Sequence, residues 1–481
     1  MTAFLISLAV LIVGYLVYGT FVDRIMGTDP KRPMPANTMR DDVDYRPMAP
    51  WRVFLIQFLN IAGLGPIFGA IMGIMFGPAA FLWIALGTIF AGGVHDFCSG
   101  VISIRMGGKS LPEIIGSQLG NGVMQFVRVF SVLLLILVAA VFILTPAQLL
   151  ATMTPSWMNA TFWIVAIFIY YMLATLLPID KLIGNIYPLF GGALLFMALG
   201  ILGVFFFGDV TIPVDFTSGF ESHNPHGLPV FPMMFVSIAC GAISGFHATQ
   251  SPMMARCLTN EKLARPIFYG AMVAEGVVAL IWAAAAVAFT GGYEQLAAYM
   301  ATEGNSAGSL VHDVSFAWLG TFGGVLAVLG VVAAPITTGD TALRSARLSL
   351  ADMFGFGQAK LWSRLAVAVP IFAVTFLVMM IDFSVLWRYF AWCNQTLAVF
   401  TLWAVTVYLA KRSKPYIISL VPACFMTVVS ISYLLAAPSP EGFGLSQPVA
   451  VGAGALVAAA VTVMFLVARR SMSTNTLLQN D

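Results

Sequence analysis

The sequence predicts an all-α, polytopic membrane protein, and its composition and patterning support this class. Of the 481 residues, 60% are hydrophobic and only 9% are charged, whereas a soluble globular protein carries about 25% charged residues to keep its surface hydrated. The apolar residues form long continuous runs that contain many of the 44 Gly and 25 Pro residues, which soluble helices rarely tolerate. Disordered chains and coiled coils are therefore excluded.

The charge balance and the cysteines exclude further classes. The formal net charge is only +2, and no basic run indicates a nucleic-acid partner. The five cysteines are scattered, odd in number and without C-x-x-C spacing. Neither a disulfide framework nor a zinc site is therefore expected, and whether another metal binds is left open.

Thirteen apolar runs are long enough to cross a bilayer as helices, which needs about 20 residues each. Closed β-barrels are excluded, because their strands alternate in short segments. The first run follows no basic residues, so we expect a span rather than a cleaved signal peptide. The predicted spans cover residues 2–22, 51–76, 78–104, 126–149, 160–178, 184–207, 231–255, 266–290, 314–342, 364–383, 385–410, 415–436 and 446–468.

The basic residues predict the orientation of these spans. Lys and Arg accumulate in cytoplasmic loops. With the N-terminus outside, all but one of the 23 basic residues are assigned to the inner side, and the exception is Arg388. The outer loops carry acids instead, such as Asp209 and Glu303. We therefore expect the N-terminus outside and the C-terminus in the cytoplasm.

The second span is predicted to be a broken helix. Its run from Asn60 to Pro66 places Gly63, Gly65 and Pro66 near the bilayer midplane. Glycine permits irregular backbone, and proline suits the first turn of a helix that restarts there. A proline kink or a glycine packing contact is the alternative.

The seventh span carries a similar run, from Cys240 to Pro252. Here Ser251 is predicted to cap a restarting helix, with Pro252 as its first residue. The two breaks lie five spans apart, in spans that run in opposite directions. This arrangement is typical of inverted-repeat secondary transporters, in which unpaired carbonyls can hold a cation and free helix N-termini can hold an anion.

This pattern divides the chain into two repeats with additions. The predicted divisions are 1–50 for an extra first helix and an inner loop, 51–207 for repeat one, 208–230 for an outer loop, 231–410 for repeat two, and 411–481 for two extra helices with a short inner tail.

Several motifs resemble those of the carbon starvation protein A (CstA) family. They are Asn60–Ile67, Phe76-Gly77-Pro78, Gly93–Phe97 with Ser99-Gly100, Ser251-Pro252, and Thr337–Asp340 with Arg344. The resemblance implies a core of the amino acid–polyamine–organocation (LeuT-like) type. It also implies an ion-coupled secondary transporter of the bacterial inner membrane, which takes up short peptides, pyruvate-like carboxylates or both during carbon starvation. This chain is shorter than the longer members, chiefly towards its C-terminal end.

The expected substrate site lies at the two breaks. Helix restarts after Gly65-Pro66 and after Ser251 would direct N–H groups at a carboxylate. The side chains that could complete the site are Ser244, His247 and Gln250. Arg388 could attract anions from the outer side, with snorkelling to the outer headgroups as the alternative.

Ionisable residues within spans are candidates for ion coupling, because charges at membrane depth are costly. Asp96 and Glu275 are predicted to couple or gate, with a hydrogen-bonded structural acid as the alternative for each. His95 could relay protons or simply pack. Asp340 lies four residues before Arg344, which favours a structural salt bridge at the inner mouth over ion coupling.

Thr337 and Thr338 are candidates for a sodium-type site. Their hydroxyls could face the carbonyls around Ala62, Gly63 and Gly65 and make an all-oxygen nest for a hard cation. The alternative is that each hydroxyl bonds back to its own helix. No cofactor is expected beyond a coupling ion, either H⁺ or Na⁺.

Other functions have less support in the sequence. The catalytic motifs H-E-x-x-H, G-x-S-x-G and the P-loop are absent, so an enzyme is not expected. No nucleotide-binding domain or ATPase partner is implied. A passive channel or a nutrient-sensing membrane protein remains the alternative to a transporter, and the expected partners are a small-molecule substrate and the lipid bilayer.

Overall fold

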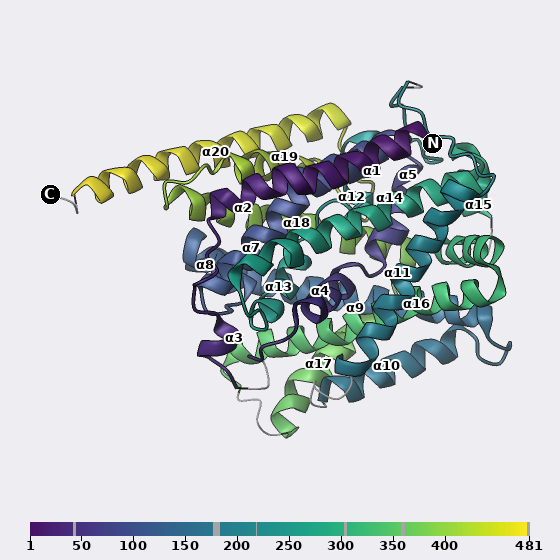
Figure 1. The fold of residues 1–481 in the computed structure, drawn as a ribbon, viewed down its shortest axis with the longest axis horizontal. Helices are drawn as coiled ribbons and strands as arrows, with labels where there is room; N and C mark the ends of the chain where they lie inside the picture. Colours follow the sequence, from purple (N-terminus) through teal and green to yellow (C-terminus); the bar gives the residue numbers. More distant parts are fainter. Residues whose placement is uncertain (42–44, 177–182, 218, 303–304, 357–360, 479–481) are drawn as a thin grey trace.

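The computed structural model is all-helical wherever it describes the chain. It describes residues 1–481 except 42–44, 177–182, 218, 303–304, 357–360 and 479–481, and no strand occurs among the described residues. Most of the long helices run roughly along the longest axis of the molecule (Figure 1). α1 and α20 lie along one side of this bundle, and α10 and α17 lie along the opposite side.

Short π-helical and 3₁₀ turns, labelled η, separate some of the α-helices. In chain order the elements are α1 (Thr2–Gly14), η1 (Tyr15–Gly19), α2 (Thr20–Met26), α3 (Pro35–Thr38), α4 (Pro50–Ile61), η2 (Gly65–Gly69), α5 (Ala70–Ile74), α6 (Ala79–Leu82), η3 (Trp83–Gly92), α7 (Gly93–Arg105), α8 (Leu111–Leu119), α9 (Asn121–Met153), α10 (Ala160–Leu176), α11 (Ile183–Phe207), η5 (Val230–Met234), α12 (Phe235–Ser237), α13 (His247–Ala255), η6 (Glu261–Leu263), η7 (Arg265–Tyr269), α14 (Gly270–Thr290), α15 (Tyr293–Ala301), α16 (Ala307–Phe354), α17 (Leu361–Val378), α18 (Phe383–Ala410), α19 (Ile417–Ala436) and α20 (Gln447–Leu478).

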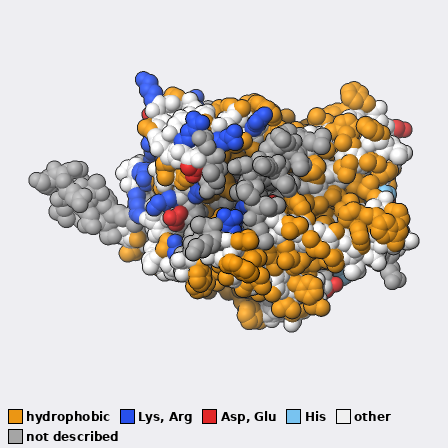
Figure 2. Space-filling view, turned by 90° about the horizontal axis from the view of Figure 1, so that it is seen from below, with side chains coloured by type: hydrophobic (Ala, Val, Ile, Leu, Met, Phe, Trp, Pro, Cys, Tyr) orange, Lys and Arg blue, Asp and Glu red, His pale blue; other side chains and the backbone are white. Residues whose placement is uncertain are grey.

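The long helices have the length and composition of membrane spans. Among the described residues, ten are long and apolar enough to cross a bilayer, or eleven if the bent pair α4 and η2–α5 counts as one span. Their outward faces are apolar, and Figure 2 shows hydrophobic side chains over much of one face. The protein is therefore a multi-pass membrane protein.

The predicted count of thirteen spans is not reached by this criterion. The predicted span 160–178 corresponds to a shorter apolar helix, Ala160–Ala174, and continues into residues outside those the structure describes. The predicted span 231–255 is divided into η5, α12 and α13, none of which is long enough to cross a bilayer alone. The thirteen-span topology therefore stays a prediction.

The predicted break in the second span is present. α4 ends at Ile61, the helix resumes at Gly65, and the two parts are bent by 53°. Pro66 lies in the first turn of the resumed helix, as expected for a residue that has no N–H to donate.

The break in the seventh span is also present, but its helix restarts earlier than predicted. Residues 238–246 are non-helical, and α13 begins at His247 with Phe246 as its N-cap residue. The prediction that Ser251 caps this helix is wrong, because Pro252 lies inside it. Pro252 has no N–H to donate to the Ala248 carbonyl one turn earlier, and the preceding Ser251 hydroxyl donates to the His247 carbonyl at 3.1 Å.

Basic side chains gather at one end of the bundle, at the left of Figure 2. At this basic end, buried Glu261 accepts hydrogen bonds from Arg105 Nε at 2.7 Å, Arg32 Nε at 3.0 Å and the Asp29 N–H at 2.7 Å. Lys414 Nζ donates to the Met26 carbonyl at 2.6 Å, and its pKa is lowered by burial and by the neighbouring cations Arg105 and Arg412. Through these contacts, the segment that follows α2 packs against the end of α7 and against η6. Three residues used in the predicted orientation, Lys181, Glu303 and Lys360, lie outside the described residues.

Candidate functional site

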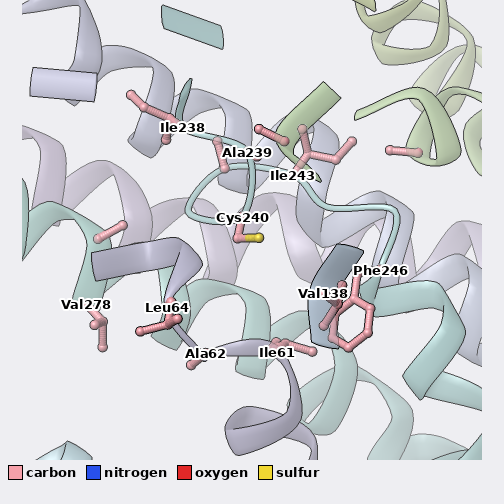
Figure 3. Close-up of a cluster of buried hydrophobic side chains, with 14 of the residues drawn as sticks. Ile61, Ala62, Leu64, Val138, Ile238, Ala239, Cys240, Ile243, Phe246 and Val278 are labelled. Atoms are coloured by element: carbon pink, nitrogen blue, oxygen red, sulfur yellow. The ribbon is translucent and has the colours of Figure 1, made fainter. Parts of the chain in front are cut away.

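The two breaks lie against each other in the interior. Figure 3 shows Ile61, Ala62 and Leu64 of the first break near Cys240 and Phe246 of the second. The approach is close enough to require glycine. A Cβ built on Gly65 would overlap Cβ and Sγ of Cys240, and one built on Gly63 would lie 3.2 Å from the Phe142 ring.

The second break is held by an amide pair on α18. The Asn394 side-chain oxygen accepts from the Ser244 hydroxyl at 2.9 Å and from the Phe246 N–H at 2.7 Å, and its backbone carbonyl accepts from the Gly245 N–H at 3.1 Å. Gln395 Nε2 lies within 3.3 Å of the carbonyls of Phe235, Ala239 and Ile243. Thr88 donates to the Gly241 carbonyl at 3.1 Å. Free N–H groups for an anion are predicted after Ser251, but the helix starts at His247, and the Phe246 N–H at this start is already bonded to Asn394.

At the first break, many more polar groups lack a hydrogen-bond partner. Within the described part of the chain, the Leu64 N–H and the Ala62 and Gly63 carbonyls form no hydrogen bond. On α4, both amide atoms of Gln57 and the side-chain oxygen of Asn60 are buried and also without a partner. A buried polar group without a partner costs about 1–3 kcal/mol. Six such polar atoms, on five residues in and before one break, therefore mark it as a candidate binding site.

Sequence reasoning missed the side chains that distinguish the two breaks. Gln57 and Asn60 lie three residues apart on one face of α4, and Asn394-Gln395 is an amide pair in the middle of an apolar span. Both patterns are visible as uncharged polar residues at membrane depth. Polarity alone, however, does not separate a side chain that ties backbone from one that is free.

A chain of four buried titratable side chains lies beside the second break. His95 Nδ1 is 2.7 Å from Asp96 Oδ1, and His247 Nδ1 is 2.9 Å from Asp96 Oδ2. His247 Nε2 lies 3.3 Å from Glu275 Oε2, within ion-pair distance but without hydrogen-bond alignment. All four side chains are fully buried. The structure thus joins three predicted candidates, namely Asp96 and Glu275 from the expected ion-coupling residues and His247 from the expected substrate site.

The remaining polar candidates at the second break have local partners. Ser244 is bonded to Asn394, and Ser251 bonds back to its own helix. Gln250 Nε2 donates to the Thr249 hydroxyl at 3.0 Å, while its Oε1 is buried without a partner. Of these three, Gln250 alone retains a free acceptor within the described residues.

Thr337 and Thr338 lie on α16, and each hydroxyl bonds back to the Ala334 carbonyl, at 2.8 and 2.9 Å. Thr338 also reaches the Leu59 carbonyl of α4, at 3.4 Å. The first of these patterns is the predicted alternative, and the second brings one hydroxyl to the end of α4. Among the described residues, neither hydroxyl forms a hydrogen bond with Gly63 or Gly65.

Two predicted candidates are paired with opposite charges. Asp340 Oδ1 lies 3.8 Å from Arg344 Nη2, so the expected pair is present. Arg388 binds Glu441, from the segment between α19 and α20, through Nε and Nη2. An anion can therefore meet a free guanidinium at Arg388 only by displacing Glu441. No group of three or more His, Cys, Asp or Glu side chains is placed to hold a metal ion in the described residues.

Comparisons with known proteins connect this geometry to membrane transporters. An uncharacterized membrane protein of Haemophilus influenzae is 42% identical over 339 residues, which are 60% of this chain and 90% of that protein. The peptide transporter CstA of Campylobacter jejuni and the pyruvate/proton symporter BtsT of Escherichia coli are each 28% identical, over 57% of this chain and 48% and 47% of their own lengths. The chain thus spans about half the length of these two named transporters.

Solved structures and a family model complete the comparison. Two variants of the Eremococcus coleocola manganese transporter superpose with TM-scores of 0.50 at 13% and 14% identity, over 88% and 92% of this chain and 95% and 98% of theirs. This likeness shows the fold alone. The family model described as carbon starvation protein CstA matches residues 1–162 and 147–319. Because these ranges cover more than half of the sequence, the chain belongs to the carbon starvation protein A family.

Proposed function

We propose that this protein is an ion-coupled secondary transporter that takes up short peptides, pyruvate-like carboxylates or both across the bacterial inner membrane. Substrate and ion would bind at the broken helices, and access would alternate between the two sides of the bilayer. The names of two relatives, a peptide transporter and a pyruvate/proton symporter, support this class. We further propose that the basic end faces the cytoplasm, because Lys and Arg accumulate there in membrane proteins.

The observation that carries the proposal is the set of free polar groups at the first break. Buried polar groups of this kind are paired with ordered water or with a bound molecule, and at the broken helix of a transporter the substrate can take the place of that water. The Leu64 N–H and the Gln57 amide can donate to a carboxylate, and the Ala62 and Gly63 carbonyls can accept from a substrate N–H or hold a cation. Pyruvate and peptides both carry a carboxylate, and peptides also carry N–H donors.

The LeuT-like inverted repeat belongs to the same proposal. Two breaks that lie far apart in the chain meet in the interior, each at the start of one proposed repeat, 51–207 or 231–410. Within the described chain, the first break has polar groups without partners, whereas the second is hydrogen-bonded to α18. We therefore infer that the two repeats have different roles in binding the substrate. The first would bind substrate, and the second would hold its helix ends in position.

Two coupling ions are compatible with the site. Sodium would find oxygens at Thr338 and Leu59 and at the free carbonyls of Ala62 and Gly63. A proton would find the buried chain of Asp96, His247 and Glu275. The proposal of ion coupling holds for either ion.

The test is uptake into proteoliposomes. Labelled pyruvate and labelled dialanine are each offered under an inward proton gradient, an inward sodium gradient, or neither. The proposal expects at least one substrate to accumulate above its external concentration under one gradient. Entry that only equilibrates the substrate would indicate a passive channel, and no entry of either substrate would reject both substrate classes.

The binding role of the first break has its own readout. Gln57→Met removes both free amide atoms while keeping the side-chain volume. If the amide contacts substrate, KM for the transported substrate should rise about tenfold or more, in line with a lost hydrogen bond to a charged group of about 1.5–3 kcal/mol. An unchanged KM would place the substrate elsewhere.

A further inference from the structure

The buried chain of histidines and acids restricts where its hydrogens can lie. Asp96 faces Nδ1 of His95 on one oxygen and Nδ1 of His247 on the other, at 2.7 and 2.9 Å. When Asp96 is ionised, both of its oxygens accept hydrogen bonds, so both rings then carry a hydrogen on Nδ1. Each neutral ring then presents a lone pair at Nε2. In His247 that lone pair faces Glu275.

This arrangement requires a proton between His247 and Glu275. His247 Nε2 and Glu275 Oε2 are 3.3 Å apart, and neither has a hydrogen-bond partner among the described residues. A lone pair and an ionised carboxylate repel each other at this separation, whereas a proton on either atom makes the contact attractive. We propose that this pair is the proton-binding site that couples transport to a proton gradient, an assignment that rests on the proposed transport function.

The surroundings favour one exchangeable proton at this position. Asp96 is assigned as the fixed anion, because an imidazole Nδ1 lies within hydrogen-bond distance of each of its oxygens and can donate to the charged form. The other titratable groups facing the pair are His95, on the far oxygen of Asp96, and the Cys240 thiol of the second break. Without the proton, two buried carboxylates would leave two uncompensated charges, which is costly at membrane depth. With it, the cluster carries one net negative charge.

The pair also connects two elements that can separate. His247 is the first residue of α13, directly after the second break, while Glu275 lies in the continuous helix α14. In the loaded state the proton lies between the two atoms, and the imidazolium or the carboxylic acid attracts its partner. When α13 moves away from α14, the contact between His247 and Glu275 opens. The proton then passes to water on the side of the membrane to which the site is open. Proton release is thereby linked to movement of the broken helix.

The first experiment separates exchange from accumulation. In Glu275→Gln the amide N–H₂ can still donate to His247 Nε2, but no exchangeable proton is held. We expect this variant to retain counterflow of labelled pyruvate or dialanine in proteoliposomes, which needs no net proton movement, and to lose accumulation under a proton gradient. Glu294→Gln, at an exposed glutamate of α15, is the matched control and should behave as wild type. Wild-type accumulation in Glu275→Gln would overturn the proposal.

The second experiment does not depend on transport or on stability in the liposome. Protein labelled with ¹⁵N-histidine is titrated in detergent, and the His247 ring signals are identified by their absence in His247→Gln. Removing the neighbouring anion makes the imidazolium less favourable, so the His247 titration midpoint should fall by about 1–3 pH units in Glu275→Gln. It should stay in place in Glu294→Gln.

The two experiments distinguish the possible failures. If wild-type protein moves neither substrate but the His247 midpoint falls, the proposed substrates are wrong and the proton site stands. If transport is proton-driven but the midpoint does not move, the function stands and this pair is not its proton site. If sodium alone drives wild-type uptake, the pair does not couple transport, whatever its titration.

Discussion

The contact between the two breaks can be tested by the smallest possible change, Gly65→Ala. Gly65 has helical backbone, so an added methyl group meets no conformational penalty there. At such a site Gly→Ala normally stabilises a protein by about 0.4–1 kcal/mol, because it restricts the unfolded chain. The added Cβ would however overlap Cβ and Sγ of Cys240, and overpacking of this kind costs about 1–3 kcal/mol. The overlap exceeds the gain, so Gly65→Ala should destabilise.

The structure also supplies the compensating change. In the double variant Gly65→Ala/Cys240→Gly the overlapping atoms are gone, and the nearest remaining atom is the Cα of residue 240, at an ordinary contact distance of 3.5 Å. Cys240→Gly alone should cost stability, since it opens a small space and removes the Sγ that Asn394 Nδ2 contacts at 3.2 Å. The double variant should nevertheless be more stable than the sum of the single changes predicts, by about 1–3 kcal/mol.

The assay is the unfolding of purified protein in detergent, with uptake measured in parallel. Gly192→Ala is the matched control, because Gly192 lies in α11 with no atom within 4 Å of its built Cβ. It should stabilise slightly. If Gly65→Ala also stabilises, or if the effects of the two changes simply add, the breaks do not touch as described, and the geometry of the site is wrong.

Three further predictions follow from other contacts. Gln57→Met should leave stability unchanged or raise it, because the amide has no partner to lose. Gln395→Met should lower stability, because three backbone carbonyls would lose their hydrogen-bond donor. An equal fall in the thermal unfolding temperature of both variants would show that Gln57 also has a structural role. Glu261→Gln should destabilise the protein by about 3–5 kcal/mol and expose the segment after α2 to limited proteolysis. Lys262→Gln breaks a half-exposed pair with Asp23 at 3.4 Å and should cost at most about 1 kcal/mol. Similar proteolysis of the two variants would contradict the role of Glu261. An impermeant thiol reagent applied to intact cells should label Asp209→Cys but not Arg412→Cys, against a low background because four of the five native cysteines are buried; the reverse pattern would invert the proposed orientation.

Local backbone chemistry explains why the first break was predictable and why the second was only partly so. Gly63, Gly65 and Pro66 occur within four residues, and this combination strongly disfavours a continuous helix. In the seventh span, Ser251-Pro252 has the same appearance, yet the helix begins at His247 and continues through the proline. The position of the restart is set by Asn394, which binds the backbone just before His247. That side chain lies about 150 residues away, and no local pattern reveals the contact.

The same limit applies to the titratable residues. Asp96, His247 and Glu275 are each conspicuous in an apolar sequence, and each could be named as a candidate. Their meeting depends on α13 and α14 packing with α7, in which Asp96 lies 151 residues before His247. Arg388 shows the opposite outcome, since a cation that breaks the charge pattern suggests an anion site until Glu441 is found beside it. Charge at membrane depth therefore identifies residues worth examining, whereas their partners decide what they can do.

Within the proposed mechanism, Cys240 is the contact through which a displacement of one broken helix is transmitted to the other. On one side it packs against Gly65, at the break whose free N–H and carbonyls would receive the substrate. On the other side it faces His247 and Glu275, the pair proposed to hold the proton. A shift of α13 on proton release must move the backbone around Cys240, and the Gly65 contact leaves no space to absorb that shift locally, because tightly packed interiors transmit displacement. A proton at the second break can thus alter the geometry of the first without any direct bond between them. Weakening this contact by Cys240→Gly should then reduce accumulation under a proton gradient more than it reduces substrate counterflow. If both fall in parallel, the contact supports the fold and carries no coupling.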